Sequence, residues 1–327
     1  MERFVFVMAI VVAAIFAVGA VIGESNWSFE LGEDGGGPAP IVDLAPGEME
    51  AAQFTGDRLR VRYTVARITI TPEDRSDFLV SIQNPGGAPM PTVSASDGRV
   101  LIDGNLRGRI SRCTEGGGAE LRGYAAVTPE TMPHIVIRAP RTLDLTVNGA
   151  NVTEIGAAQT LEIDQSGCGV TTAGDVQGEL NVDLAGSGAV NAGVVQTLEA
   201  DLAGSGEINV SEVAQRANVD IAGSGAVAIA RLNGELDANN AGSGNLFVRG
   251  GAVTQADVDL AGSGGATISA PVTRLNASIV GSGDVVVEGD VGDIDAEIAG
   301  SGGVRAWAVT GQIQRRILGS GEVQVGR

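Results

Sequence analysis

The chain has 327 residues, of which 43% are apolar and 19% are charged, and its net charge is −19. All 21 basic residues are arginine, and the acidic balance opposes contact with a polyanion, so we exclude a nucleic-acid-binding function. The apolar fraction excludes an intrinsically disordered chain, and the length allows a large core. That core must be aliphatic, because only 3% of the residues are aromatic.

Residues 1–23 are typical of an export segment. Arg3 precedes an uncharged apolar run from Phe4 to Gly23, and Ala20 ends a Val-Gly-Ala sequence of the kind that signal peptidases cleave. The run also has the roughly 20 residues that a membrane-spanning helix needs. A cleaved signal peptide and a retained membrane anchor formed by residues 4–23 therefore both remain open. Residues 24–52, rich in Gly, Pro and acidic residues, are predicted to be a linker.

Residues 53–141 are predicted to form irregular β cap coils, because short alternating segments such as 61–70 are separated by turns. This segment contains Cys113, and the following region contains Cys168. In an oxidising compartment the two cysteines are a candidate disulfide. A catalytic thiol would need a nearby base, and His134 is the only histidine of the chain, so we assign no catalytic residue.

Residues 142–327 contain an internal repeat marked by Ala-Gly-Ser-Gly or a close variant. Residues 160–164 match residues 197–201, which places Cys168 in the serine position, and residues 142–145 begin one further unit. Ten units of about 19 residues are therefore visible. The corner serines are Ser187, Ser205, Ser224, Ser243, Ser263, Ser282, Ser301 and Ser320.

Within each unit, apolar and polar residues alternate with period two on both sides of the corner. Ala200 and Leu202 are expected to point inward, whereas Asp201 between them is expected to face solvent. A unit this short cannot bury its own core and must stack on its copies. The sequence therefore predicts an all-β protein, a parallel β-helix or solenoid with coils of about 19 residues, preceded by an N-terminal export segment.

The Gly-Ser-Gly corner is interpreted as a structural turn ladder. Glycine adopts positive φ and permits close approach of stacked coils, and the small serine hydroxyl is expected to bond to the neighbouring coils. A row of nucleophilic serines is excluded, because the repeats contain no histidine and the chain contains no lysine to act as a base.

An acidic column is predicted four residues before the corner, at Asp164, Asp183, Asp201, Asp220 and Asp259. Carboxylates stacked about 4.8 Å apart either repel one another or recruit a cation. The Gly-Gly-x-Gly-x-Asp signature of calcium-binding solenoids does not match these turns, so we favour a solvated acidic face. A cation site stays open as an alternative, and we assign no metal or cofactor.

The export signal, the strand-rich segments 60–71 and 100–104, and the Ala-Gly-Ser-Gly coils of residues 185–321 resemble a known family. It is the putative auto-transporter adhesin head GIN domain family (DUF2807) of secreted bacterial proteins. The resemblance covers about residues 54–325. It implies a right-handed β-helix in the bacterial envelope without an established enzymatic activity.

We therefore expect an exported, non-catalytic β-solenoid in the periplasm or at the surface of a bacterium. It would act as an adhesin-like head or envelope interaction module with a protein or glycan as its ligand. Two alternatives remain. A polysaccharide-active β-helix enzyme is the first, because paired carboxylates catalyse glycoside hydrolysis, although the coils lack aromatic platforms for sugars. A purely structural envelope protein is the second.

Overall fold

The computed structural model describes residues 44–114 and 117–326, which lie within one compact unit, Pro40–Arg327. Every secondary-structure element assigned in this part of the chain is a β-strand. The predicted export segment, residues 1–23, lies outside the described residues, as do residues 24–43 of the predicted linker. Residues 47–52, also predicted to be linker, belong instead to the strand Gly47–Phe54. Among the described residues, no helix has the length and hydropathy needed to cross a membrane.

The strands that precede the sequence repeat are β1 (Gly47–Phe54), β2 (Arg58–Thr64), β3 (Arg67–Glu73), β4 (Phe78–Asn84), β5 (Thr92–Ser96), β6 (Arg99–Asp103), β7 (Ile110–Cys113), β8 (Ala119–Leu121) and β9 (His134–Pro140). The strands of the repeat region are β10 (Thr142–Gly149), β11 (Val152–Ile155), β12 (Thr160–Gly167), β13 (Val170–Ala173), β14 (Val176–Gly186), β15 (Ala189–Gly204), β16 (Glu207–Gly223), β17 (Ala226–Ile229), β18 (Leu232–Gly242), β19 (Asn245–Val248), β20 (Gly251–Gly262), β21 (Gly265–Ile268), β22 (Val272–Gly281), β23 (Asp284–Gly300), β24 (Gly303–Val309), β25 (Ile313–Gly319) and β26 (Glu322–Val325).

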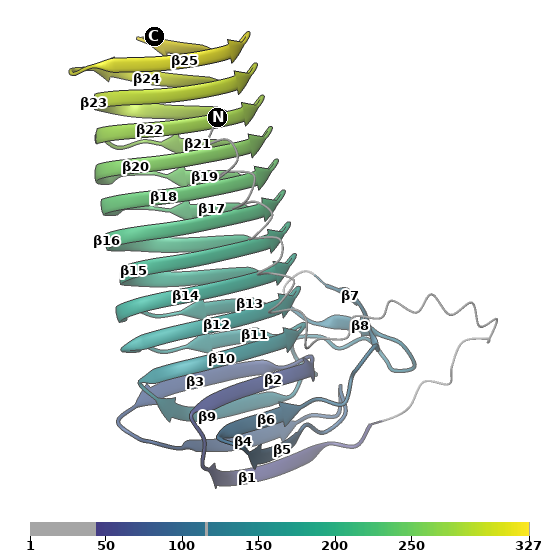
Figure 1. Ribbon diagram of the computed structural model, residues 1–327. Coiled ribbons are helices and arrows are strands. Elements are labelled where there is room, and N and C mark those ends of the chain that lie inside the picture. Colours follow the sequence, from purple (N-terminus) through teal and green to yellow (C-terminus); the bar gives the residue numbers. More distant parts are fainter. Residues whose placement is uncertain (1–43, 115–116, 327) are drawn as a thin grey trace, which may run out of the picture. The chain divides into compact units, whose positions relative to one another are not determined.

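Successive coils of the repeat stack in parallel, with equivalent residues directly above one another (Figure 1). Where β15 pairs with β16, for example, Asp201 faces Asp220 and Leu202 faces Ile221. Parallel strands lie about 4.8 Å apart, so each position of the repeat becomes a continuous column along the stack. The all-β solenoid with coils of about 19 residues is confirmed.

The core fills the inside of the coils, and the inward alternation holds. Leu198, Ala200 and Leu202 are buried before the corner, and Ile208 and Val210 are buried after it. A further buried column lies on a third side of the coil. It is not apparent from the sequence, because insertions vary its distance from the corner serine. Its members are Val176, Val195, Val213 and Leu232 and, after a step in register where Val253 pairs with Gly234, Val253, Val272 and Val291.

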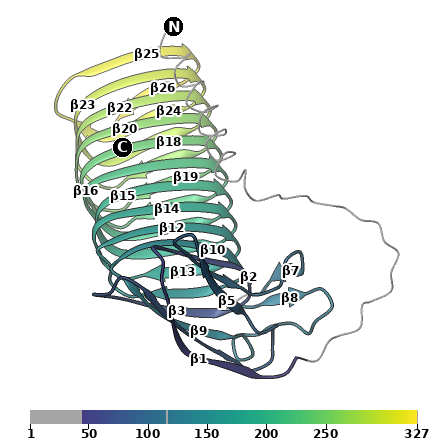
Figure 2. The ribbon, with the colours of Figure 1, turned by 60° about the horizontal axis from the view of Figure 1, so that its bottom comes forward.

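At the N-terminal end of the stack, the order in space differs from the order along the chain. β2 pairs in parallel with both β6 and β10, and β3 pairs in parallel with both β9 and β11. The coil of residues 58–73 contains β2 and β3. On one side it pairs with β6 and β9, and on the other side it pairs with β10 and β11 of the first repeat unit. β4 pairs antiparallel with β9 and β1, and β5 forms an antiparallel pair with β6 (Figure 1). Figure 2 shows the same end of the stack, with β1, β3 and β9.

The last described coil leaves its inward row open. Ile313 and Ile317 were expected to face the core, yet they are 44% and 38% exposed, because no described coil covers them. Between them, Arg315 takes the column position that Ala296 holds in the coil below. A charged residue pointing inward on an edge strand opposes edge-to-edge pairing with another sheet.

Candidate functional site

The Gly-Ser-Gly corner is a ladder of main-chain hydrogen bonds. The glycine before each serine from Gly186 to Gly319 has φ between +120° and +138°. The serine N–H donates to the corner glycine one coil below, as from Ser205 to the carbonyl of Gly186 at 2.9 Å. Within the described residues, the hydroxyls of these serines make no hydrogen bond, and their residues are exposed. The ladder therefore depends on the backbone rather than on the expected hydroxyl contacts.

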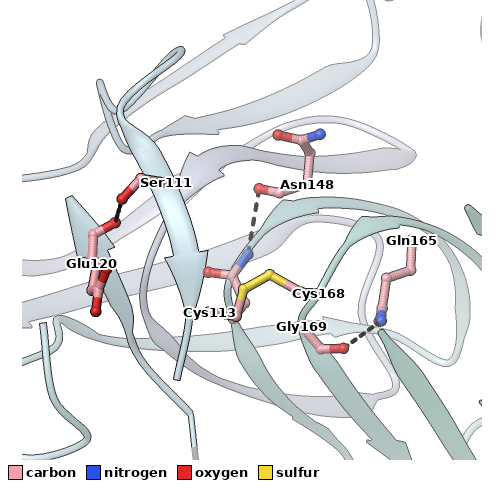
Figure 3. Close-up of a disulfide and its surroundings, with 8 residues drawn as sticks. Ser111, Cys113, Glu120, Asn148, Gln165, Cys168 and Gly169 are labelled. Atoms are coloured by element: carbon pink, nitrogen blue, oxygen red, sulfur yellow. Dashed lines mark hydrogen bonds between the residues drawn. A yellow bond between two sulfur atoms is a disulfide. The ribbon is translucent and has the colours of Figure 1, made fainter. Parts of the chain in front are cut away.

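One corner is covered by a segment that leaves the stack, residues 104–133, which we call the excursion. It carries the short antiparallel pair of β7 and β8, drawn beside β10–β13 in Figure 1. The structure joins Cys113 at the end of β7 to Cys168 at a corner in a disulfide, with a Cα–Cα distance of 6.3 Å (Figure 3). In the chain-entropy model a crosslink across 55 residues contributes roughly 4 kcal/mol.

A second, smaller hydrophobic cluster underlies the excursion. Leu106, Leu121 and Val127 of the excursion are buried together with Val65 and Ala150 of the coils. Tyr63, Tyr124 and both cysteines pack against this cluster. The excursion is therefore a folded feature with its own core, fixed to the flank of the stack by apolar contacts and a covalent bond.

A pocket of about 400 Å³ lies where β2, β6 and the excursion meet. β2 contains a bulge here. Val61 faces Val147 of β10 and Thr64 faces Gly149, so two residues of β2, Arg62 and Tyr63, lie opposite one residue of β10. The excursion is fastened beneath the bulge by a hydrogen bond from the Leu106 N–H to the Tyr63 carbonyl at 3.1 Å. The residues that line the pocket are Arg62, Tyr63, Asp103, Asn105, Arg107 and Arg109.

The pocket residues are positioned by strand pairing and by two residues with unusual backbone angles. Tyr63 and Asn105 both have positive φ, at 52° and 59°. Arg62 and Asp103 are direct partners in the β2–β6 pair, and the Arg62 Nε donates to the Asp103 carboxylate at 2.8 Å. The other oxygen of Asp103 accepts from the Asn105 N–H at 2.8 Å, which fixes the start of the excursion.

Two aromatic rings hold the arginines of the pocket. The Arg62 and Arg107 guanidinium carbons lie 5.5 Å and 5.8 Å from the centre of the Tyr63 ring. Arg109 lies 5.5 Å from the centre of the Tyr124 ring and donates from Nη1 to the Arg122 carbonyl at 3.3 Å. These distances are typical of cation–π contacts. This pocket is not apparent from the sequence, since Tyr63 and Arg107 are brought together only by the β2–β6 pairing.

The acidic column faces outward, as the alternation predicts, but its carboxyl groups are partly buried. Burial, followed by the charge of Asp201, raises the pKa of Asp183 from 3.8 to about 6. Burial and the charge of Asp220 raise the pKa of Asp201 to about 6 as well. Burial and the charge of Asp183 also raise the pKa of Asp164. Asp164, Asp183 and Asp201 therefore bind protons at higher pH than exposed aspartates do.

A second acidic column runs beside the first, six residues before the corner. Asp144, Glu162, Glu199, Asp237, Asp257 and Asp295 belong to it. Asparagines interrupt it, and the Asn276 amide donates to Asp257 at 2.5 Å. Burial and neighbouring carboxylates raise the pKa of Asp144, Glu162 and Asp237. The constant spacing from the serine was the signal that could have revealed this column.

Neither column assembles into a metal centre. No three His, Cys, Asp or Glu side chains are grouped as a metal ion would require in the part of the chain that the structure describes. Two residues that could serve nucleophilic chemistry are also engaged elsewhere, since Cys113 and Cys168 form the disulfide. His134 lies on β9, with its Nε2 3.1 Å from the Thr69 hydroxyl on the neighbouring strand.

The disulfide is predicted to hold the excursion rather than the stack. Native protein should contain no titratable thiol. Replacing both cysteines, Cys113→Ser with Cys168→Ser, should leave the core of β14–β16 protected from hydrogen exchange and should lower protection in β7 and β8. Serine at position 168 is the residue of the other corners, so this change suits the local backbone. Two reactive thiols in the native protein, or unchanged protection of the excursion, would refute the prediction.

The crowded carboxyl groups predict that the protein is more stable at mildly acidic pH. Asp183 and Asp201 have a pKa of about 6 in the folded protein, compared with 3.8 for an aspartate in an unfolded chain. Between pH 3.8 and about pH 6 the folded state therefore binds more protons than the unfolded state does. Stability must then decrease as pH rises through this window. Hydrogen bonds from arginine lower the pKa of Glu73 and Asp77. The stability that these two carboxylates contribute is therefore lost only at more acidic pH. The midpoint of thermal unfolding should therefore be higher at about pH 5 than at about pH 8.

Asp201→Asn should reduce this pH dependence, because it removes one of the crowded carboxyl groups. It should also stabilise the protein at about pH 8, where like charges in the column repel. Asp290→Asn is the matched control, since Asp290 is exposed on β23 outside both columns. Equal pH dependence in the wild type and the Asp201 variant would contradict the crowding argument.

Comparisons with known proteins found one family model and several solved structures that are similar to this chain. Residues 134–213 match the family model described as "Putative auto-transporter adhesin, head GIN domain" (DUF2807), which is the family that the sequence resembles. No curated protein matches the chain. A solved structure of a putative lipid binding protein from Parabacteroides distasonis is 18% identical, with a TM-score of 0.43, and the match covers 88% of this chain and 99% of that one. A putative adhesin from Parabacteroides merdae is 14% identical, with a TM-score of 0.42 and coverage of 88% and 98%.

Proposed function

We propose that the protein is an exported, non-catalytic, adhesin-like module in which the solenoid supports a binding site at the excursion. The observation that carries this proposal is the pocket of about 400 Å³ between β2, β6 and a disulfide-linked excursion. Elsewhere the coils repeat one another. Beside β2 and β6 the chain departs from the repeat. The excursion forms a second apolar cluster there, and charged side chains line an open pocket.

The volume of the pocket and its polar lining support the binding of a small polar ligand. Small-molecule sites are commonly concave, with volumes from about 300 to 1,000 Å³, and use a few placed polar groups for specificity. Arg62, Tyr63 and Arg107 offer such groups here. The match of residues 134–213 to the adhesin head GIN domain family begins at β9, which directly follows the excursion. That match supports an adhesin-like module and an envelope or extracellular location.

The chemistry of the pocket supports binding without turnover. Its carboxylate, Asp103, is held by Arg62 and by the Asn105 N–H, and the remaining lining side chains are arginine, asparagine and tyrosine. A glycoside hydrolase needs two carboxyl groups flanking the bond that breaks. The crowded carboxyl groups of Asp183 and Asp201 lie on the face of the stack and do not line this pocket.

The proposal is tested with the full chain expressed in bacteria. Fractionation should recover it outside the cytoplasm. The purified protein should then bind to bacterial and host surface preparations, with saturation, and release no soluble sugar from them. Cytoplasmic recovery would overturn export, and product release would overturn the non-catalytic assignment. Failure to bind any of these surfaces would favour the purely structural envelope protein.

A further inference from the structure

The pocket at the excursion has a charge opposite to that of the rest of the chain. Three of its six lining residues are arginine and one is aspartate, whereas the whole chain has a net charge of −19. Asp103 neutralises Arg62, since the two form an ion pair at 2.8 Å. Arg107 and Arg109 form no ion pair with a carboxylate of the described residues. The pocket therefore retains two positive charges that the protein itself does not neutralise.

The two uncompensated guanidinium groups are placed so that they can donate hydrogen bonds. The guanidinium carbons of Arg107 and Arg109 lie over tyrosine rings, 5.8 Å and 5.5 Å from the ring centres. A guanidinium has five N–H donors, so a ring contact does not exhaust its capacity to donate hydrogen bonds. Arg109 uses one nitrogen, Nη1, for the Arg122 carbonyl. The rings also limit the motion of the long side chains, so less conformational entropy is lost when a ligand binds.

We propose that this pocket binds one oxyanion group, a carboxylate, phosphate or sulfate, on a ligand of about monosaccharide size. The inference rests on the proposed binding function and names its ligand class. Guanidinium groups pair with such anions through two parallel N–H···O bonds. The acidic columns of the solenoid repel an extended polyanion, so the ligand carries its charge at one end or as a single group.

The test uses three sugars that share a ring but differ in charge: glucuronate, glucose and glucosamine. Titration calorimetry with the full chain at low salt should detect binding of glucuronate and neither of the other two. Inorganic phosphate and sulfate, used as competitors, report whether the site prefers those oxyanions to a carboxylate. Affinity should fall as salt is added, because the contact is between charges near the surface.

Variants of the pocket separate a binding role from a structural one. Arg107→Gln with Arg109→Gln should weaken glucuronate binding by about tenfold or more, since both charge-assisted donors are lost. Arg305→Gln, which alters an arginine paired with Asp284 at 3.0 Å on the coils, is the matched control and should bind normally. Asp103→Asn should strengthen binding, because it releases the charge of Arg62 and keeps an oxygen for the Asn105 N–H. A gain of affinity cannot arise from misfolding.

Three outcomes would overturn the oxyanion inference: no binding of any of the anions, equal binding of glucose and glucuronate, or unchanged binding by the double arginine variant. The proposed function is judged separately by the surface-binding assay. If the wild type and the double arginine variant bind those surfaces equally, the protein remains an interaction module and the pocket is not its anion site. If neither binds, the proposed function itself fails.

Discussion

The close approach of stacked main chains at the Gly-Ser-Gly corner is the constraint on which the remaining structure depends. A Cβ built on Gly242 would lie 2.4 Å from the carbonyl oxygen of Gly223, and on Gly281 it would lie 2.2 Å from that of Gly262. Real Cβ atoms do not approach an oxygen so closely. The positive φ of these residues adds a second requirement for glycine. Together they fix the height of each coil over the one below, and with it the register of the columns on either side of the corner.

Identical register has a favourable and an unfavourable consequence. On the inside it places Leu202 over Leu184 and under Ile221, so that a continuous aliphatic core forms from coils that are too short to fold alone. On the outside it places Asp183, Asp201 and Asp220 in a row, where burial and neighbouring charge raise the pKa of Asp183 and Asp201. The same register directs Cys168 to the corner that the excursion covers.

The regular part of the molecule was predictable from the sequence because its contacts lie at a constant separation along the chain. Alternation around Ser205 was sufficient to orient Leu202 and Asp201. The pocket was not predictable, because it depends on β6 pairing with β2 across a long separation and on a backbone bulge at Tyr63, where a residue other than glycine has positive φ. The outward direction of the acidic column was predictable from the alternation. The partial burial of Asp183 was not, since it depends on the side chains above and below it.

The most direct test of the account compares two glycine substitutions in the same part of the stack. Gly242→Ala forces a Cβ toward the Gly223 carbonyl at φ +138°, whereas Gly250→Ala places a Cβ 3.5 Å from the Ala230 carbonyl without positive φ. Urea unfolding should show that the first costs about 1–3 kcal/mol or more, whereas the second should stay within about 0.5 kcal/mol of the wild type or stabilise it slightly. Equal stability of the two variants would contradict the claim that the corner glycines set the stacking of the coils.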